Sequence, residues 1–88
     1  MLLRITEERL EGFTVMHVAG RLAGEGVEEL SRACRAVAGP LRLELSALLH
    51  ADEAGLALLR SLRDSGAEIC GVSPFIELLL EGGKFNAS

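Results

Sequence analysis

Residues 41–62 read LRLELSALLHADEAGLALLRSL and contain two different periodicities of leucine. In the first five positions leucine alternates with arginine and glutamate, which is typical of a strand with one apolar face. Further along, Leu56, Leu59 and Leu62 recur every three residues, which is typical of a helix with one apolar face. Asp52 is a favourable N-cap for that helix. The stretch therefore predicts a strand at 41–46, a loop at 47–51 and a helix at 52–65.

The loop at 47–51 contains two consecutive leucines, Leu48 and Leu49. Each of them could face the core or anchor a binding partner. The pattern does not decide between these two roles, because a loop has no fixed side-chain period.

The segments before this stretch predict a hairpin and a helix. A turn at Glu11-Gly12 separates two runs rich in apolar and β-branched residues, so we expect a hairpin over 1–19, ended by Gly20. The period then becomes helical over 26–38, and Gly39-Pro40 follows. The apolar face of this helix is formed by Val27, Leu30, Cys34 and Val37.

The segments after it predict one more strand and one more helix. Residues 67–72 read as a short strand, and Ser73-Pro74 supplies an N-cap followed by a proline at the first helical position. The last helix is expected at 74–81, before Gly82-Gly83. Its inward-facing residues are expected to be Phe75, Ile76, Leu79 and Leu80.

These elements predict an α/β fold in a single domain over 1–88. Their order is strand, strand, helix, strand, helix, strand, helix. The first two strands should be antiparallel, and each strand–helix–strand crossover should make its strands parallel. We therefore expect a four-stranded mixed sheet, covered mainly on one face by three helices.

Charge and hydropathy exclude several classes of partner. The 88 residues include 9 basic and 13 acidic side chains, for a net charge of −4. Surfaces that bind nucleic acid or anionic membranes are usually basic. No stretch reaches the roughly 20 predominantly apolar residues of a membrane span, and the first residues lack the apolar run of a signal peptide. We expect no nucleic-acid partner, no membrane insertion and a cytoplasmic location.

Candidate catalytic and metal-binding side chains are few. Cys34 and Cys70 have no C-x-x-C spacing and no neighbouring histidine, so buried free thiols are expected, with a disulfide left open. His50, Asp52 and Glu53 lie close in sequence, but a metal site needs three or four ligands of defined geometry. We therefore predict no catalytic residue, no metal ion and no cofactor. An enzyme remains the least favoured alternative, and it would use these three residues.

Four motifs then occur in a fixed order along the chain. The strand at 41–46 ends in Glu44-Leu45-Ser46, and the next helix opens at Asp52-Glu53-Ala54-Gly55. Upstream, Val18–Leu22 reads VAGRL, and downstream residues 66–74 run from a glycine through a strand to Ser73-Pro74. Over 13–81 the chain in this way resembles the STAS domain family, the anti-sigma-factor antagonists of bacterial signalling and transcription regulation.

The resemblance implies a protein-interaction module rather than an enzyme. Its relatives bind a histidine-kinase-like anti-sigma factor through the second helix and the loop before it. The positions that correspond to this partner-binding site are Leu49, His50, Asp52, Glu53, Ala54 and Gly55. The same turn also resembles the Asp-Thr-Ala-Gly turn of small STAS subunits in ABC-type lipid-transport systems, which gives an alternative partner, a transport ATPase.

The turn departs from the family's phosphorylation switch. Regulatory members carry a serine or threonine where this chain has Glu53 and Ala54, and neither has a hydroxyl group. We therefore expect no phosphorylation site here. Glu53 acts either as a fixed negative charge in place of phosphate, or as an acid that complements the dipole of the helix.

Overall fold

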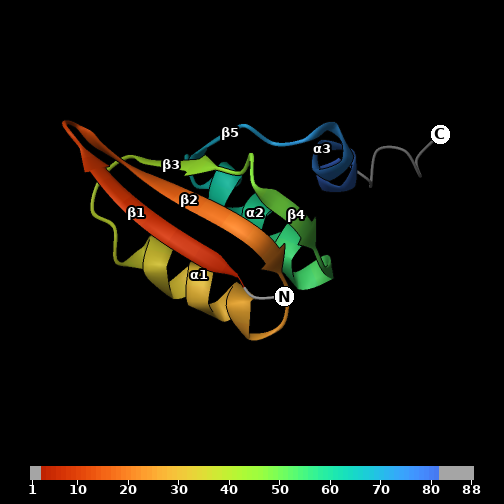
Figure 1. Ribbon diagram of the computed structural model, residues 1–88. Helices are drawn as coiled ribbons and strands as arrows, with labels where there is room; N and C mark the ends of the chain where they lie inside the picture. Colours follow the sequence, from red (N-terminus) through yellow and green to blue (C-terminus); the bar gives the residue numbers. More distant parts are fainter. Residues whose placement is uncertain (1–2, 82–88) are drawn as a thin grey trace.

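The structure, a computed structural model, describes residues 3–81 (Figure 1). Its strands and helices alternate through most of the chain. In order they are β1 (Arg4–Leu10), β2 (Phe13–Leu22), α1 (Glu25–Arg35), β3 (Leu41–Glu44), β4 (Leu48–Ala51), α2 (Glu53–Asp64), β5 (Glu68–Cys70) and α3 (Pro74–Leu80).

The long strand β2 is the centre of the sheet. β1 pairs with it antiparallel along one edge, from Arg4 opposite Ala19 to Leu10 opposite Phe13. Gly12 completes the turn between them with φ 91°, a left-handed conformation that suits glycine. The sequence prediction of an opening antiparallel hairpin is confirmed.

The other edge of β2 pairs with two strands in succession. β3 lies parallel to the first half of β2, and β4 lies parallel to its end, at Gly20–Leu22. β5 then pairs parallel with β3. The described residues therefore form a mixed sheet of five strands, with the parallel crossovers that the order of elements predicts.

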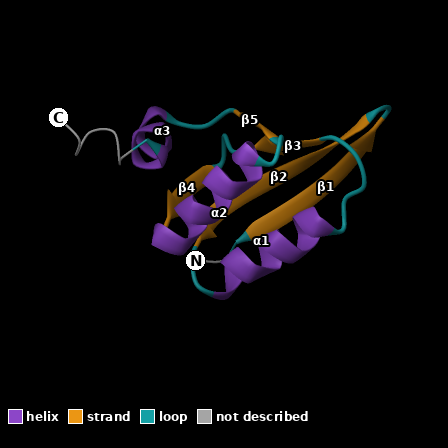
Figure 2. Ribbon diagram, turned by 180° about the vertical axis from the view of Figure 1, so that it is seen from behind, coloured by secondary structure: helices purple, strands orange, loops and turns teal. Residues whose placement is uncertain are grey.

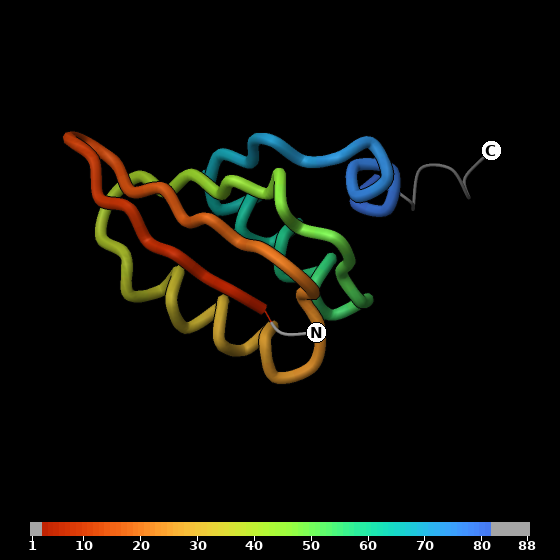
Figure 3. The backbone as a smooth tube through the Cα atoms, in the orientation of Figure 1, coloured from red at the N-terminus to blue at the C-terminus, as the bar shows by residue number. Residues whose placement is uncertain are grey.

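Helices α1 and α2 lie side by side over one face of this sheet (Figure 2). Helix α3 sits at the end of the sheet, where it contacts α2 and β4 (Figures 1 and 3). The core lies between the sheet and the helices and is aliphatic. Its most deeply buried side chains are Met16, Val18, Leu22, Leu30, Leu43, Leu45, Leu59 and Ile76.

Helix α3 is short, and specific contacts fix both of its ends. The Ser73 side chain accepts a hydrogen bond from the backbone N–H of Ile76 at 3.2 Å, as an N-cap does. At the other end, the guanidinium of Arg60 on α2 donates to the carbonyls of Leu79 at 3.0 Å and Leu80 at 2.8 Å. A cation at the C-terminus of a helix also complements its dipole.

The structure corrects the sequence prediction in the number and extent of the strands. The sheet has a fifth strand, β4, in the segment that was predicted as the loop 47–51. β2 also continues through Gly20 to Leu22 instead of ending at Gly20. Gly20 has φ 95°, and the register shifts between Gly20 and Arg21, so the glycine marks an irregularity within the strand rather than its end.

The predicted helices are confirmed, with small changes at their ends. The helix expected at 26–38 spans 25–35, the one at 52–65 spans 53–64 between Asp52 and Ser65, and the one at 74–81 spans 74–80. The glycines expected to end the last helix lie outside the described residues. Phe75 was predicted to face inward and is instead 58% exposed, because Ile76 and Leu80 form the buried side of α3.

None of the three helices in the described part has the length and apolar character needed to cross a membrane.

The two leucines of β4 have opposite environments, and this predicts opposite effects of truncation. Leu48 is 3% exposed and packs in the core, whereas Leu49 is 64% exposed. Leu48→Ala should lower the free energy of unfolding by about 2–5 kcal/mol, because it leaves a cavity. Leu49→Ala should change it by no more than about 0.5 kcal/mol. Urea unfolding measures both, and similar losses for the two variants would contradict the placement of β4.

Candidate functional site

The first turn of α2 is the segment for which the family resemblance predicts partner binding, and Asp52 fixes its position. One carboxylate oxygen of Asp52, Oδ1, accepts a hydrogen bond from the N–H of Gly55 at 2.7 Å. The other, Oδ2, accepts from the N–H of Gly24 at 3.2 Å, and the N–H of Asp52 donates to the carbonyl of Leu22 at 3.0 Å. Asp52 is thus the N-cap of α2 and also ties α2 to the loop before α1.

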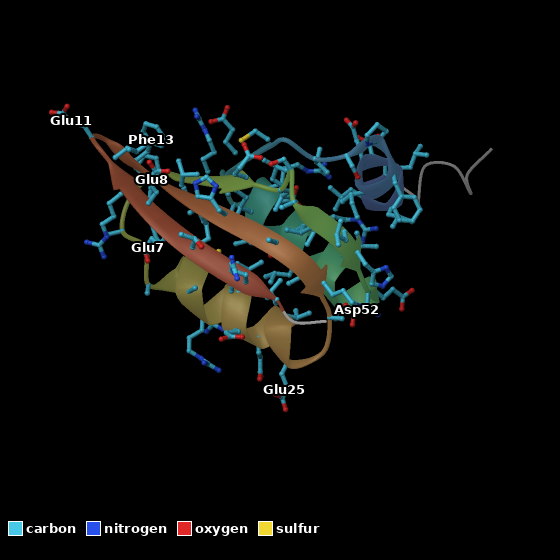
Figure 4. All side chains as sticks on the ribbon, viewed as in Figure 1. Glu7, Glu8, Glu11, Phe13, Glu25 and Asp52 are labelled. Atoms are coloured by element: carbon cyan, nitrogen blue, oxygen red, sulfur yellow. The ribbon has the colours of Figure 1, made fainter. Side chains whose placement is uncertain are left out.

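Gly55 is buried where the first turn of α2 meets the end of β2. A Cβ atom at this position would lie 2.5 Å from the carbonyl oxygen of Leu22 and 3.0 Å from the Leu22 side chain. A separation under about 3 Å from backbone forces the helix or the strand to move. Glycine at this position therefore lets α2 start directly against the end of β2 (Figure 4 shows Asp52 at this place).

This close approach predicts the sign of a substitution. Gly55→Ala should destabilise the protein, although alanine is favoured over glycine inside helices by about 0.5–1 kcal/mol. Thermal unfolding measures the effect. Ala57→Gly, at an exposed position of the same helix, is the matched control and should cost only the helix propensity, about 1 kcal/mol. A Gly55→Ala variant that is more stable than the parent would show that α2 does not pack closely on β2.

The electrostatics of Asp52 agree with its role in joining α2 to the loop before α1. The hydrogen bond from the N–H of Gly55, followed by that from Gly24, lowers the pKa of the Asp52 carboxyl from its ordinary value of 3.8. Both bonds favour the charged form, so the ionised carboxylate holds the two segments together. The lowered pKa also makes this group a poor proton donor at neutral pH.

Because its carboxyl pKa is lowered, the stabilisation of the fold by Asp52 depends on pH. The folded state holds the proton of Asp52 less readily than the unfolded state, so its stabilising effect is present above pH about 4 and is lost as the pH falls through the folded pKa. Asp52→Asn should therefore be less stable than the parent at pH 7, and the difference should shrink as the pH falls toward 3. Urea unfolding of both proteins from pH 7 to 3 measures this. A difference that stays constant would mean that the charge of Asp52 does not contribute.

The structure separates the six predicted partner-binding residues into exposed and buried ones. Leu49, Glu53 and Ala54 are exposed and available for contact. His50 and Asp52 are half-buried, and Gly55 is buried against Leu22. Asp52 and Gly55 therefore shape the site, whereas Leu49, Glu53 and Ala54 form its surface.

Two further exposed apolar residues lie on α3, and the sequence prediction missed both. Phe75 is 58% exposed and Leu78 is 52% exposed, and α3 packs against β4 and α2 at the same end of the molecule (Figure 1). The exposed residues Leu49, Glu53, Ala54, Phe75 and Leu78 lie on three elements that contact one another, and we name this set the α2–α3 end. Leu49, Phe75 and Leu78 are three of the four large apolar side chains that are exposed within residues 3–81, the fourth being Leu10 in the hairpin.

Among residues 3–81, no three His, Cys, Asp or Glu side chains lie close enough together to hold a metal ion. His17 contacts Glu8, with 3.1 Å between Nε2 and Oε1. Glu44 accepts a hydrogen bond from the N–H of Ser46 at 3.0 Å, and the contacts with Ser46 lower the pKa of its carboxyl.

Both cysteines are free thiols, as expected. Cys34 is buried, and this burial raises the pKa of its thiol to about 11. Cys70 is only half-buried, in contrast to the expectation, and its thiol lies 3.7 Å from Oε2 of Glu44. Its pKa is also raised, by desolvation and by the charge of Glu44. Raised thiol pKa values disfavour the nucleophilic thiolate form.

Comparisons with known proteins bear on the fold alone. No family model matches the sequence, and no curated protein matches it. A solved structure described as "Crystal Structure Analysis of Mglu" superposes with a TM-score of 0.60 at 21% sequence identity. The match covers 73% of this chain and 18% of that one, so the fold corresponds to a small part of a much longer protein.

Proposed function

We propose that this protein is a protein-interaction module that regulates a partner by stoichiometric binding, in the manner of an anti-sigma-factor antagonist of the STAS family. The observation that supports this most strongly is the first turn of α2. Asp52 and Gly55 hold that turn in place, and Glu53 and Ala54 lie exposed on it. A rigid, exposed turn next to exposed apolar side chains suits recognition of another protein, because little ordering entropy is lost on binding.

The partner proposed first is a histidine-kinase-like anti-sigma factor. In this proposal the exposed side chains of Leu49, Phe75 and Leu78 supply apolar contact area, and Glu53 supplies the charge. An apolar centre with a charged group at its side is the usual composition of a protein interface. Because the turn has no hydroxyl group, binding in this proposal is constitutive and is not switched by phosphorylation at positions 53 and 54.

A subunit of an ABC-type transport ATPase complex is the second candidate partner. The sequence Asp52-Glu53-Ala54-Gly55 favours it, because Ala54 and Gly55 match the turn of such subunits. Both candidate partners are proteins that would bind the same surface. One experiment distinguishes them, because it identifies the protein that is captured. Capture on the immobilised chain from the native host, followed by mass spectrometry, should recover a kinase-like ATPase in the first case and a transporter ATPase in the second.

Reversing one exposed charge tests whether the recovered partner binds the α2–α3 end. Glu53→Lys should leave the melting temperature nearly unchanged, because Glu53 is exposed and contributes to folding mainly through the helix dipole, about 0.3–1 kcal/mol. Its affinity for the partner, measured by calorimetry, should fall about tenfold or more, because the charge is reversed at the interface.

A matched control distinguishes this effect from a general change in charge. Asp64→Lys also reverses an exposed acid, at the opposite end of α2, and should leave the affinity unchanged. Equal losses for the two variants would indicate long-range attraction only. A large fall in the melting temperature of Glu53→Lys with intact binding would make Glu53 structural and would contradict the proposed docking surface.

A further inference from the structure

Among the described strands, β1 forms one long edge of the sheet. β4 lies on the other side of β2, whereas β1 has β2 as its neighbour on one side and no described strand on the other. Six of its seven residues are exposed. Unpaired edges of this length readily pair with another strand unless their side chains prevent it.

The backbone hydrogen bonds of β2 show which groups of β1 point outward. The N–H groups of Thr14 and Gly20 donate toward β3 and β4, to Pro40 and Ala47. The backbone N–H and C=O groups of successive residues in a strand point to opposite sides, so those of Phe13, Val15, His17 and Ala19 face β1. Their partners are Arg4, Thr6, Glu8 and Leu10. The N–H and C=O groups of Ile5, Glu7 and Arg9 therefore face the free edge.

We propose that this edge pairs with the β1 edge of a second copy of the chain, antiparallel, with a twofold axis at Thr6. In this register each outward-facing Ile5 pairs with Glu7 of the second copy by backbone hydrogen bonds. On the sheet face without helices, Arg4 of each copy lies opposite Glu8 of the other, and the two Thr6 side chains face each other. Opposite charges and threonine pairs at these positions stabilise antiparallel strands.

The charges on β1 fit this register and no neighbouring one. Moving the axis by one residue toward the turn would place the two Glu7 side chains opposite each other and Arg4 opposite Leu10. Moving it the other way would place Arg4 opposite Thr6. Either shift leaves the Arg4 guanidinium without an opposite acid, and no ion pair within residues 3–81 involves Arg4. Glu7 is already paired within its own strand, with Arg9 at 3.0 Å. Glu8 contacts His17 through Oε1 alone, at 3.1 Å, and its side chain is 54% exposed, so its second oxygen can accept from Arg4 of the other copy.

Helix α1 supplies a second match of charge around the same axis. Its start lies at the start of β1, where Gly26 approaches Leu3, and its end lies under the hairpin, where Ala36 and Arg9 line one hollow. α1 thus runs in the direction of β1, and the twofold axis sets the two copies of α1 antiparallel on one side of the joined sheet. The acidic first turn of each helix, which contains Glu25 and Glu28, is then directed toward the basic last turn of the other.

A charge swap tests the register. Sedimentation equilibrium of the parent over a wide concentration range should show a monomer–dimer equilibrium. The dissociation constant of the dimer should rise with added salt. Arg4→Glu and Glu8→Arg should each raise the dissociation constant by about tenfold or more, because each creates two pairs of like charges. The double variant restores both opposite-charge pairs, so its dissociation constant should return to within about threefold of the parent.

A proline substitution tests the edge itself. Glu7→Pro removes an N–H that faces the free edge, so it should abolish the dimer and retain the folded monomer. Thr6→Pro is the control, because it removes an N–H that faces β2 and should unfold the hairpin. A parent that stays monomeric at the highest soluble concentration would overturn the proposal. A dimer insensitive to Glu7→Pro, or a double variant as weak as the single ones, would overturn it as well.

Discussion

The carboxylate of Asp52 is the contact on which the arrangement of the helices depends. It accepts hydrogen bonds from two backbone N–H groups that are 31 residues apart in the chain, those of Gly24 before α1 and Gly55 in α2. The N–H of the same residue donates to Leu22 at the end of β2. Three segments thus meet at one residue, and α1 and α2 both start where the central strand ends.

This meeting point separates the residues that build the site from those that can bind a partner. Gly55 can approach Leu22 closely because it has no side chain, and Asp52 directs both of its oxygens into the protein. Glu53 and Ala54, which lie between them in the sequence, are left on the outside. A partner would therefore contact a turn whose backbone is already held in place, and binding would require little rearrangement.

The fold could be predicted largely from the sequence because its periodicities are strong. The alternation at Leu41–Leu45 and the leucine spacing of α2 gave a strand and a helix that the structure contains. The cap at Asp52 could also be predicted, because N-caps are local features. The hydrogen bond from Gly24 could not, because it joins residues that only the tertiary fold brings together.

The errors arise at positions where tertiary pairing or packing, and not the local sequence pattern, decides the structure. β4 has four residues without alternation, since both Leu48 and Ala51 are buried across an irregular register, and no local pattern marks it as a strand. Gly20 was interpreted as a strand end although it lies inside β2. Phe75 was placed in the core because it is apolar, but α3 buries the side that carries Ile76 and Leu80 and leaves Phe75 exposed. The outward position of Leu49 also depended on the pairing of β4 and is visible only in the structure.

The sharing of β2 among three strands has a consequence for the order of folding. Its pairing with β1 is local, across a turn of two residues, whereas Thr14 pairs with Leu41 and Gly20 pairs with Leu48 only after long loops have closed. Closing such loops loses chain entropy before any contact compensates for it. We expect the hairpin to form first and to act as the template on which the parallel strands assemble. Helix α3, held at the chain's end by Arg60, would dock last.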